Sequence, residues 1–174
     1  MLGVTEISAI VAVAGVLVGV IYYLLDVHNQ AMIRKTQLIT SLYSIFGSEE
    51  HLRAGKEISK INYEDYDDFV KKYGAPNSEE PIPMAIDKVL YFFEEVGVLL
   101  SKKLVDINLI DQLMGYNIIM IGTKTMPIIT EARKRLNLPH VWINFEYLYN
   151  EMKKREQKLQ QPKAHFPSKI SGSP

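Results

Sequence analysis

Apolar residues are concentrated in one long run near the start of the chain. Residues 7–25 read ISAIVAVAGVLVGVIYYLL and contain no charged side chain. A helix of about 19 residues rises roughly 28 Å, which is close to the hydrocarbon thickness of a bilayer. No Lys or Arg precedes the run and no small-residue cleavage step follows it, so the pattern favours an uncleaved anchor over a signal peptide. We expect residues 1–25 to form an N-terminal transmembrane helix.

The charges beside this run predict its orientation. Arg34 and Lys35 follow the run, whereas the short segment before it carries only Glu6. Basic residues favour the cytoplasmic side, and the aromatic rings of Tyr22 and Tyr23 suit the membrane interface. We therefore expect a single-pass protein of the cell membrane, with its N-terminus outside and its C-terminal domain in the cytoplasm.

Gly15 and Gly19 form a G-x-x-x-G pair inside the run. Small residues at this spacing let two membrane helices approach closely, so the pair is a candidate dimer face. The alternative is coincidence, because glycine is common in membrane helices.

Beyond the run the apolar pattern is helical. Apolar residues recur at steps of three and four before Gly47, namely Met32, Leu38, Ile39, Leu42, Ile45 and Phe46. We expect the membrane helix to continue as a juxtamembrane helix over residues 26–47 and to stop at Gly47. Ser48 is the expected cap of the next helix, and Asn62 is the expected cap of a short helix that ends near Gly74.

Residues 48–160 are expected to form a helical cytoplasmic domain. The strongest periodicity lies between residues 82 and 104, where one face holds Ile86, Val89, Leu90, Phe93, Val96, Gly97, Leu100 and Leu104. Asp106 is the expected cap of the following helix, which Pro127 should kink or break. A last helix carries Phe145, Leu148, Tyr149 and Met152. Because alternating strand patterns are lacking, the predicted fold class is all-α, a small helical bundle behind a membrane helix.

Composition narrows the classes of function. Apolar residues make up 47% of the 174, which is enough for a folded core. The 20 basic and 20 acidic side chains cancel, so no overall charge attracts nucleic acid. The absence of cysteine excludes disulfides and thiolate chemistry.

The last residues, 161–174, are predicted to be a flexible basic tail, because proline, serine and glycine accumulate there. Basic residues outnumber acidic ones from Glu151 onward, which allows contact with anionic lipid or only a solvated helix end. No aromatic residues alternate with these charges, so a nucleic-acid partner is not expected.

Two adjacent carboxylates, Glu94 and Glu95, interrupt the apolar stretch YFFEEVGVLLSKKLVD. Neighbouring helical residues diverge by about 100°, so the two are not a catalytic pair. Glu95 points away from the apolar face, whereas Glu94 lies at its edge, in line with Asp87. We expect Glu94 to pair with a basic group of another helix, with Arg133 as the candidate; the alternative is that Glu94 belongs to a site.

Other residue types match no catalytic, cofactor or metal template. EDYDD lacks the glycine and terminal glutamate of a calcium loop, GTKT lacks the glycine spacing of a phosphate loop, and no G-x-S-x-G is present. The histidines have no second ligand at a suitable spacing, and we expect His51 at the surface. Asn117 lies on an apolar helix face, where its amide either bonds to backbone or contacts a ligand. Glu94, Asn117 and Arg133 are thus the polar candidates for a site.

Several stretches together resemble a family of single-span proteins classed as a domain of unknown function. They are YEDYDDFVKKYG, YFFEEVGVLLSKKLVD, MPIITEARKRL and NFEYLYNEM. The resemblance implies a small helical cytoplasmic domain behind an N-terminal anchor, and it implies no ligand or catalytic residue.

These patterns favour a membrane-anchored scaffold or interaction module, whose partners are the bilayer and either another protein or a second copy of the chain. The alternative is a membrane-tethered enzyme of unrecognised type.

Overall fold

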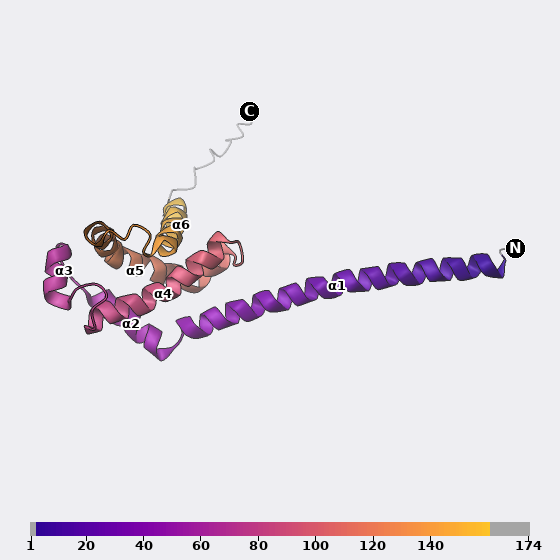
Figure 1. Ribbon diagram of the computed structural model, residues 1–174, viewed down its shortest axis with the longest axis horizontal. Coiled ribbons are helices and arrows are strands. Elements are labelled where there is room, and N and C mark those ends of the chain that lie inside the picture. Colours follow the sequence, from indigo (N-terminus) through magenta and orange to yellow (C-terminus); the bar gives the residue numbers. More distant parts are fainter. Residues whose placement is uncertain (1–2, 161–174) are drawn as a thin grey trace, which may run out of the picture. The chain divides into compact units, whose positions relative to one another are not determined.

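Helices form all the regular structure in residues 3–160, the part of the chain that the computed structural model describes (Figure 1). Side chains are described from residue 12 to residue 159, together with Gly3. The predicted tail, residues 161–174, lies outside the described residues. The elements are α1 (Val4–Phe46), α2 (Glu49–Lys60), α3 (Tyr66–Tyr73), α4 (Pro81–Ser101), α5 (Ile107–Leu136) and α6 (Ile143–Gln160). This arrangement confirms the all-α fold class.

The first helix, α1, is continuous through the apolar run and beyond it, as predicted. It ends at Phe46, directly before Gly47. Every side chain from residue 12 to residue 37 is exposed. The chain divides into two compact units between Ser44 and Ile45, and the second unit holds α2 to α6.

Short polar side chains cap three helices of this second unit, α2, α3 and α5. The Ser48 hydroxyl accepts a hydrogen bond from the His51 amide at 3.3 Å, and the Asp106 carboxylate accepts one from the Asn108 amide at 2.7 Å. Both caps were predicted. The predicted cap Asn62 is wrong, because Asp65 caps α3 and the Asn62 amide donates to the hydroxyl of Tyr73 instead.

The apolar face of α4 is the centre of the core. Phe93, Val89 and Val96 are fully buried, and Phe93 stacks on Phe145 of α6 with 5.9 Å between ring centroids. Leu104 was predicted to share this face but is 54% exposed. The reason is that α4 ends at Ser101, earlier than the pattern suggested.

Pro127 does not break α5, which runs through it from Ile107 to Leu136. A proline removes one backbone hydrogen bond, but it does not remove the burial on either side. Ile121 before it and Ile128 after it are both buried, so packing holds the two halves in one helix.

The crossing of α4 with α6 is unusually close. A Cβ atom on Gly97 would lie 2.2 Å from the main-chain oxygen of Asn144, a distance no side chain can occupy. The absence of a side chain at this position therefore lets the two backbones meet directly. α6 packs against both α4 and α5, and Phe145, Leu148 and Met152 are its fully buried side chains.

Glu94 of α4 caps the first turn of α6. Its carboxylate accepts hydrogen bonds from the Phe145 amide at 2.7 Å, from the Asn144 amide at 3.2 Å and from the Asn144 side chain at 2.8 Å. Trp142 precedes α6 and Ile143 is its first residue. Neither of these two side chains can accept such hydrogen bonds. A negative charge at a helix N-terminus is also favourable toward the helix dipole. The predicted pairing of Glu94 with Arg133 is therefore wrong.

This arrangement predicts the ranking of three neighbouring substitutions in the full chain, measured by thermal and denaturant unfolding in detergent micelles. Phe93→Ala should cost roughly 3 kcal/mol or more, because a fully buried ring leaves a cavity. Glu94→Gln should cost about 1 kcal/mol, because the first turn of α6 loses a charged acceptor. Glu95→Gln is the matched control and should change stability by about 0.5 kcal/mol or less, because its side chain is exposed. Equal losses for Glu94→Gln and Glu95→Gln would contradict the capping role.

Candidate functional site

A cavity of about 60 Å³ lies between α3, α4, α5 and the loop before α6. We call it the Trp142 pocket. Its lining is mostly apolar and consists of Phe69, Pro76, Asn77, Pro83, Ile86, Asp87, Leu90, Ile128, Ile129, Ala132, Arg133, Leu136, Leu138, Val141 and Trp142. Trp142 also contacts Tyr91 edge to face, with 4.7 Å between ring centroids. A mostly apolar hollow with a few polar groups is the usual form of a small-ligand site.

Backbone strain is concentrated at this pocket. Trp142 and Asn77 both adopt positive φ, at 58° and 63°. For a bulky residue such as tryptophan this conformation is uncommon and costs energy. Two of the four non-glycine residues with positive φ in the described chain thus line one cavity. Strain of this kind gathers at functional sites.

One residue of the pocket wall carries an unsatisfied polar atom. In the described part of the chain, two buried side-chain atoms lack a hydrogen-bond partner, Arg133 Nη2 and Ser78 Oγ. Arg133 lines the pocket, and Ser78 follows the lining residue Asn77. Buried polar groups in folded proteins are normally paired, so these two atoms call for an explanation.

Asp87 is the carboxylate of the pocket wall. It is partly buried, and burial raises the pKa of its carboxyl group above the ordinary value. No side chain or amide within residues 3–160 donates a hydrogen bond to it or forms an ion pair with it. Two residues of the pocket wall, Asp87 and Arg133, thus carry polar atoms without a partner in the described chain.

Arg133 is held in place by its other atoms. Its Nη1 forms an ion pair with Glu146 of α6, and its Nε donates to the main-chain oxygen of Val141 at 2.8 Å. The side chain is only 15% exposed. The guanidinium thus joins α5 to the start of α6 and leaves one buried amino group, Nη2, unpaired.

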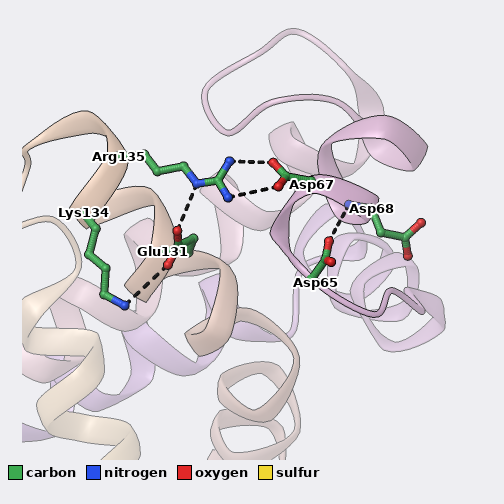
Figure 2. Close-up of polar contacts among 6 residues, drawn as sticks. All are labelled: Asp65, Asp67, Asp68, Glu131, Lys134 and Arg135. Atoms are coloured by element: carbon green, nitrogen blue, oxygen red, sulfur yellow. Dashed lines mark hydrogen bonds and ion pairs between the residues drawn. The ribbon is translucent and has the colours of Figure 1, made fainter.

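Surface ion pairs connect α3 to α5 (Figure 2). α3 supplies Phe69 to the lining of the Trp142 pocket. Both amino groups of Arg135 bond to the Asp67 carboxylate, and its Nε donates to Glu131 at 3.0 Å. The guanidinium also lies over the Tyr66 ring, 4.5 Å from the centroid. The pKa of Arg135 is raised by its hydrogen bonds to Asp67 and Glu131. These groups are exposed, so the contacts orient the wall more than they stabilise it.

A second hollow lies between α2 and α5. We call it the α2–α5 groove. Its volume is about 740 Å³, and its wall comprises Phe46, Gly47, Glu49, His51, Leu52, Arg53, Gly55, Lys56, Ser59, Val89, Phe93, Tyr116, Asn117, Met120 and Ile121. Leu52 and Tyr116 at its sides are 54% and 78% exposed. Such exposed apolar groups beside an open groove are typical of a docking surface.

Asn117 lies on the wall of this groove. Its amide is only partly buried, and no residue of the described chain forms a hydrogen bond with it. The expected bond to neighbouring backbone is therefore not present. Whether Asn117 contacts a ligand stays a prediction.

His51 is buried, at 5% exposure, and not at the surface as predicted. Its ring lies 4.9 Å from that of Phe92 and 5.9 Å from that of Phe93. The reason is the position of α2, which packs on α4 with the face that also carries Ala54 and Ile58. Burial, and then the charge of Lys88, lower the pKa of His51.

The three polar residues predicted from the sequence do not meet in one site. Glu94 caps α6, Asn117 lines the α2–α5 groove, and Arg133 lines the Trp142 pocket. Asp87 and Trp142 were not predicted as site residues, although Asp87 shares the helix edge of Glu94. In the described chain no three His, Asp or Glu side chains are grouped to hold a metal ion. Gly15 and Gly19 have nothing within 4 Å of a Cβ position, and their role as a dimer face stays a prediction.

The structure thus defines an all-α protein, and among its described residues one helix, α1, is long and apolar enough to cross a membrane. The qualifying span covers Ala12–Phe46, with a mean hydropathy of 1.5 in its most apolar window. The family model described as a domain of unknown function, DUF4760, matches residues 8–152. The chain belongs to this family, which confirms the expected resemblance. No curated protein and no solved structure matches the chain.

The environment of His51 predicts a specific loss of stability on acidification. The unfolded state binds a proton near pH 6.5, whereas the folded state resists it until lower pH. The contribution of His51 is therefore complete above about pH 6.5 and falls as the pH drops below that value. Thermal unfolding of the full chain in micelles between pH 7.5 and 5.5 measures this loss.

His51→Phe keeps an aromatic ring and removes the titration, so its unfolding should depend less on pH than that of the unsubstituted protein. His140→Gln is the control, because His140 is exposed and its replacement should leave the pH dependence unchanged. An unchanged pH dependence in His51→Phe would show that the buried imidazole is not the sensitive group.

Proposed function

We propose that this protein is a membrane-anchored interaction module, with α1 in the cell membrane and the domain formed by α2 to α6 in the cytoplasm. The observation that carries the proposal is the α2–α5 groove, a large open hollow whose floor is apolar and whose sides expose Leu52 and Tyr116. Its partner is an amphipathic helix of another protein.

The anchoring rests on the surface of α1. Large apolar side chains from Val13 to Ile33 are between 47% and 76% exposed where they are described. A water-exposed stripe of this length is costly, whereas a bilayer covers it. Arg34 and Lys35, which follow the most apolar part, favour a cytoplasmic location for the rest of the chain.

The lining of the groove supports a helical occupant. Amphipathic helices bind by laying an apolar face, with anchors at i, i+3, i+4 and i+7, into a groove between two helices. Val89, Phe93 and Ile121 contribute to the groove from α4 and α5, and all three are almost completely buried. The groove thus has a rigid apolar floor and leaves its exposed sides for the partner.

The charges along α2 indicate which helix would fit. Arg53 and Lys56 of α2 lie on the groove wall and are exposed; Arg53 already pairs with Glu49 at 3.1 Å. No acidic side chain in the described chain forms an ion pair with Lys56. An acidic residue beside the apolar face of the partner helix would complement this cation, which favours specificity and the rate of association more than affinity.

The orientation can be tested with two single cysteines, because the natural chain has none. Lys158→Cys, on the exposed surface of α6, should resist an impermeant maleimide in intact cells and react after lysis. Gly3→Cys, before the apolar run, is the matched control and should react in intact cells. The reverse pattern would place the domain outside the cell, and labelling of both in intact cells would exclude a spanning α1.

The groove can be tested with a photo-crosslinking residue in living cells. Placed at Tyr116, it should capture a protein through a segment with an amphipathic helical pattern, mapped by mass spectrometry. The same residue at Tyr147 is the control, because Tyr147 is 41% exposed but does not line the groove.

A further substitution makes this test specific. Leu52→Asp puts a charge on the groove wall and should abolish the Tyr116 adduct while helical content, measured by circular dichroism, is retained. Identical adducts from positions 116 and 147, or adducts unaffected by Leu52→Asp, would overturn the docking role. A crosslink to another copy of the chain would overturn the proposed partner and show that the groove serves self-association.

A further inference from the structure

We propose that the Trp142 pocket binds a small uncharged aliphatic molecule whose head group, an amide or an alcohol, both accepts and donates a hydrogen bond. The proposal concerns a different site from the α2–α5 groove and does not depend on the docking role given to that groove. It rests on the polar atoms, the size and the charge of the pocket.

The polar atoms of the wall define the head group. Arg133 Nη2 is a buried donor without a partner in the described chain, and Asp87 is an acceptor without one. Leaving such groups unpaired in an apolar surrounding costs free energy. A neutral head group with one acceptor and one donor can form hydrogen bonds with both the Arg133 donor and the Asp87 acceptor. A hydrocarbon can form neither bond.

The volume of the pocket limits the apolar part. A single water molecule needs about 10–15 Å³ on the same scale, and an engineered cavity of about 150 Å³ holds benzene. By these two comparisons a cavity of about 60 Å³ holds about two to four heavy atoms, which fits a short branch such as an isopropyl group. Ile86, Leu90 and Ile128 are nearly completely buried walls that match such a branch.

The charges of the pocket disfavour an ionic ligand. The positive charge of Arg133 is already paired with Glu146, so an anion would meet the unpaired carboxylate of Asp87 without a free cation. A cation would pair with Asp87 but would leave the donor Arg133 Nη2 unsatisfied. An uncharged ligand avoids both conflicts. It also avoids the large free-energy cost of moving a full charge from water into an apolar site.

Trp142 makes the site directly observable. It is the single tryptophan of the chain, and it lines the pocket. We would titrate the full chain in lipid nanodiscs at pH 7.5 with isobutyramide, isobutyrate and isobutylammonium, which share the same branched carbon skeleton and differ in charge. Indole fluorescence is the first readout, and saturation-transfer NMR on the same probes is the second, independent of any spectral change.

Isobutyramide should bind saturably, at millimolar strength because so small a ligand makes few contacts, and at least about tenfold more tightly than either ion. Asp87→Ala should weaken this binding about fivefold or more with the helical circular dichroism unchanged. Glu95→Gln, an exposed substitution on the same helix, is the control and should leave binding unchanged.

Four results would contradict the proposal. Tightest binding of isobutylammonium would make the pocket a cation site, and tightest binding of isobutyrate would make it an anion site; either result overturns the proposal. Absence of saturable binding by both readouts would also overturn it, since the pocket would then have no affinity for the head group that its unpaired atoms define. Binding of isobutyramide unaltered by Asp87→Ala would likewise overturn the proposal, because the head group would not meet the acceptor from which it was inferred.

Discussion

The carboxylate of Glu94 holds the first turn of α6, and the position of α6 completes both the core and the Trp142 pocket. α6 supplies Phe145 and Leu148 to the core, and the loop that leads into it supplies Val141 and Trp142 to the pocket. Because neither Trp142 nor Ile143 can accept hydrogen bonds through its side chain, an acceptor from α4 takes that role at the start of α6. A helix end capped by a different helix couples local and tertiary structure, so neither forms fully without the other.

Much of the fold could be predicted from the sequence because its causes are local. The helical periodicity, the caps Ser48 and Asp106, and the stop at Gly47 depend on residues a few positions apart. The exceptions have tertiary causes. His51 is buried because α2 lies on α4, and α5 continues through Pro127 because both of its halves are packed.

The sites could be predicted only in fragments, for the same reason. Asp87 and Glu94 lie at one edge of one helix and differ little in sequence, yet Glu94 has three donors and Asp87 has none in the described chain. The difference comes from the groups opposite each of them, which are the start of α6 in one case and a cavity in the other. No spacing rule separates two such residues, because the donors that distinguish Glu94 come from an element fifty positions away.

The direct backbone contact at Gly97 has a mechanical consequence for the Trp142 pocket. Where Gly97 meets Asn144, no flexible side chain lies between α4 and α6 to take up a displacement, so these two helices act as a stiff frame. The opposite wall, α3, is joined to α5 in part by exposed ion pairs, which dissolved salt weakens. The pocket therefore has one unyielding side and one more compliant side, and dissolved salt should loosen the compliant side slightly while its buried residue Phe69 stays packed.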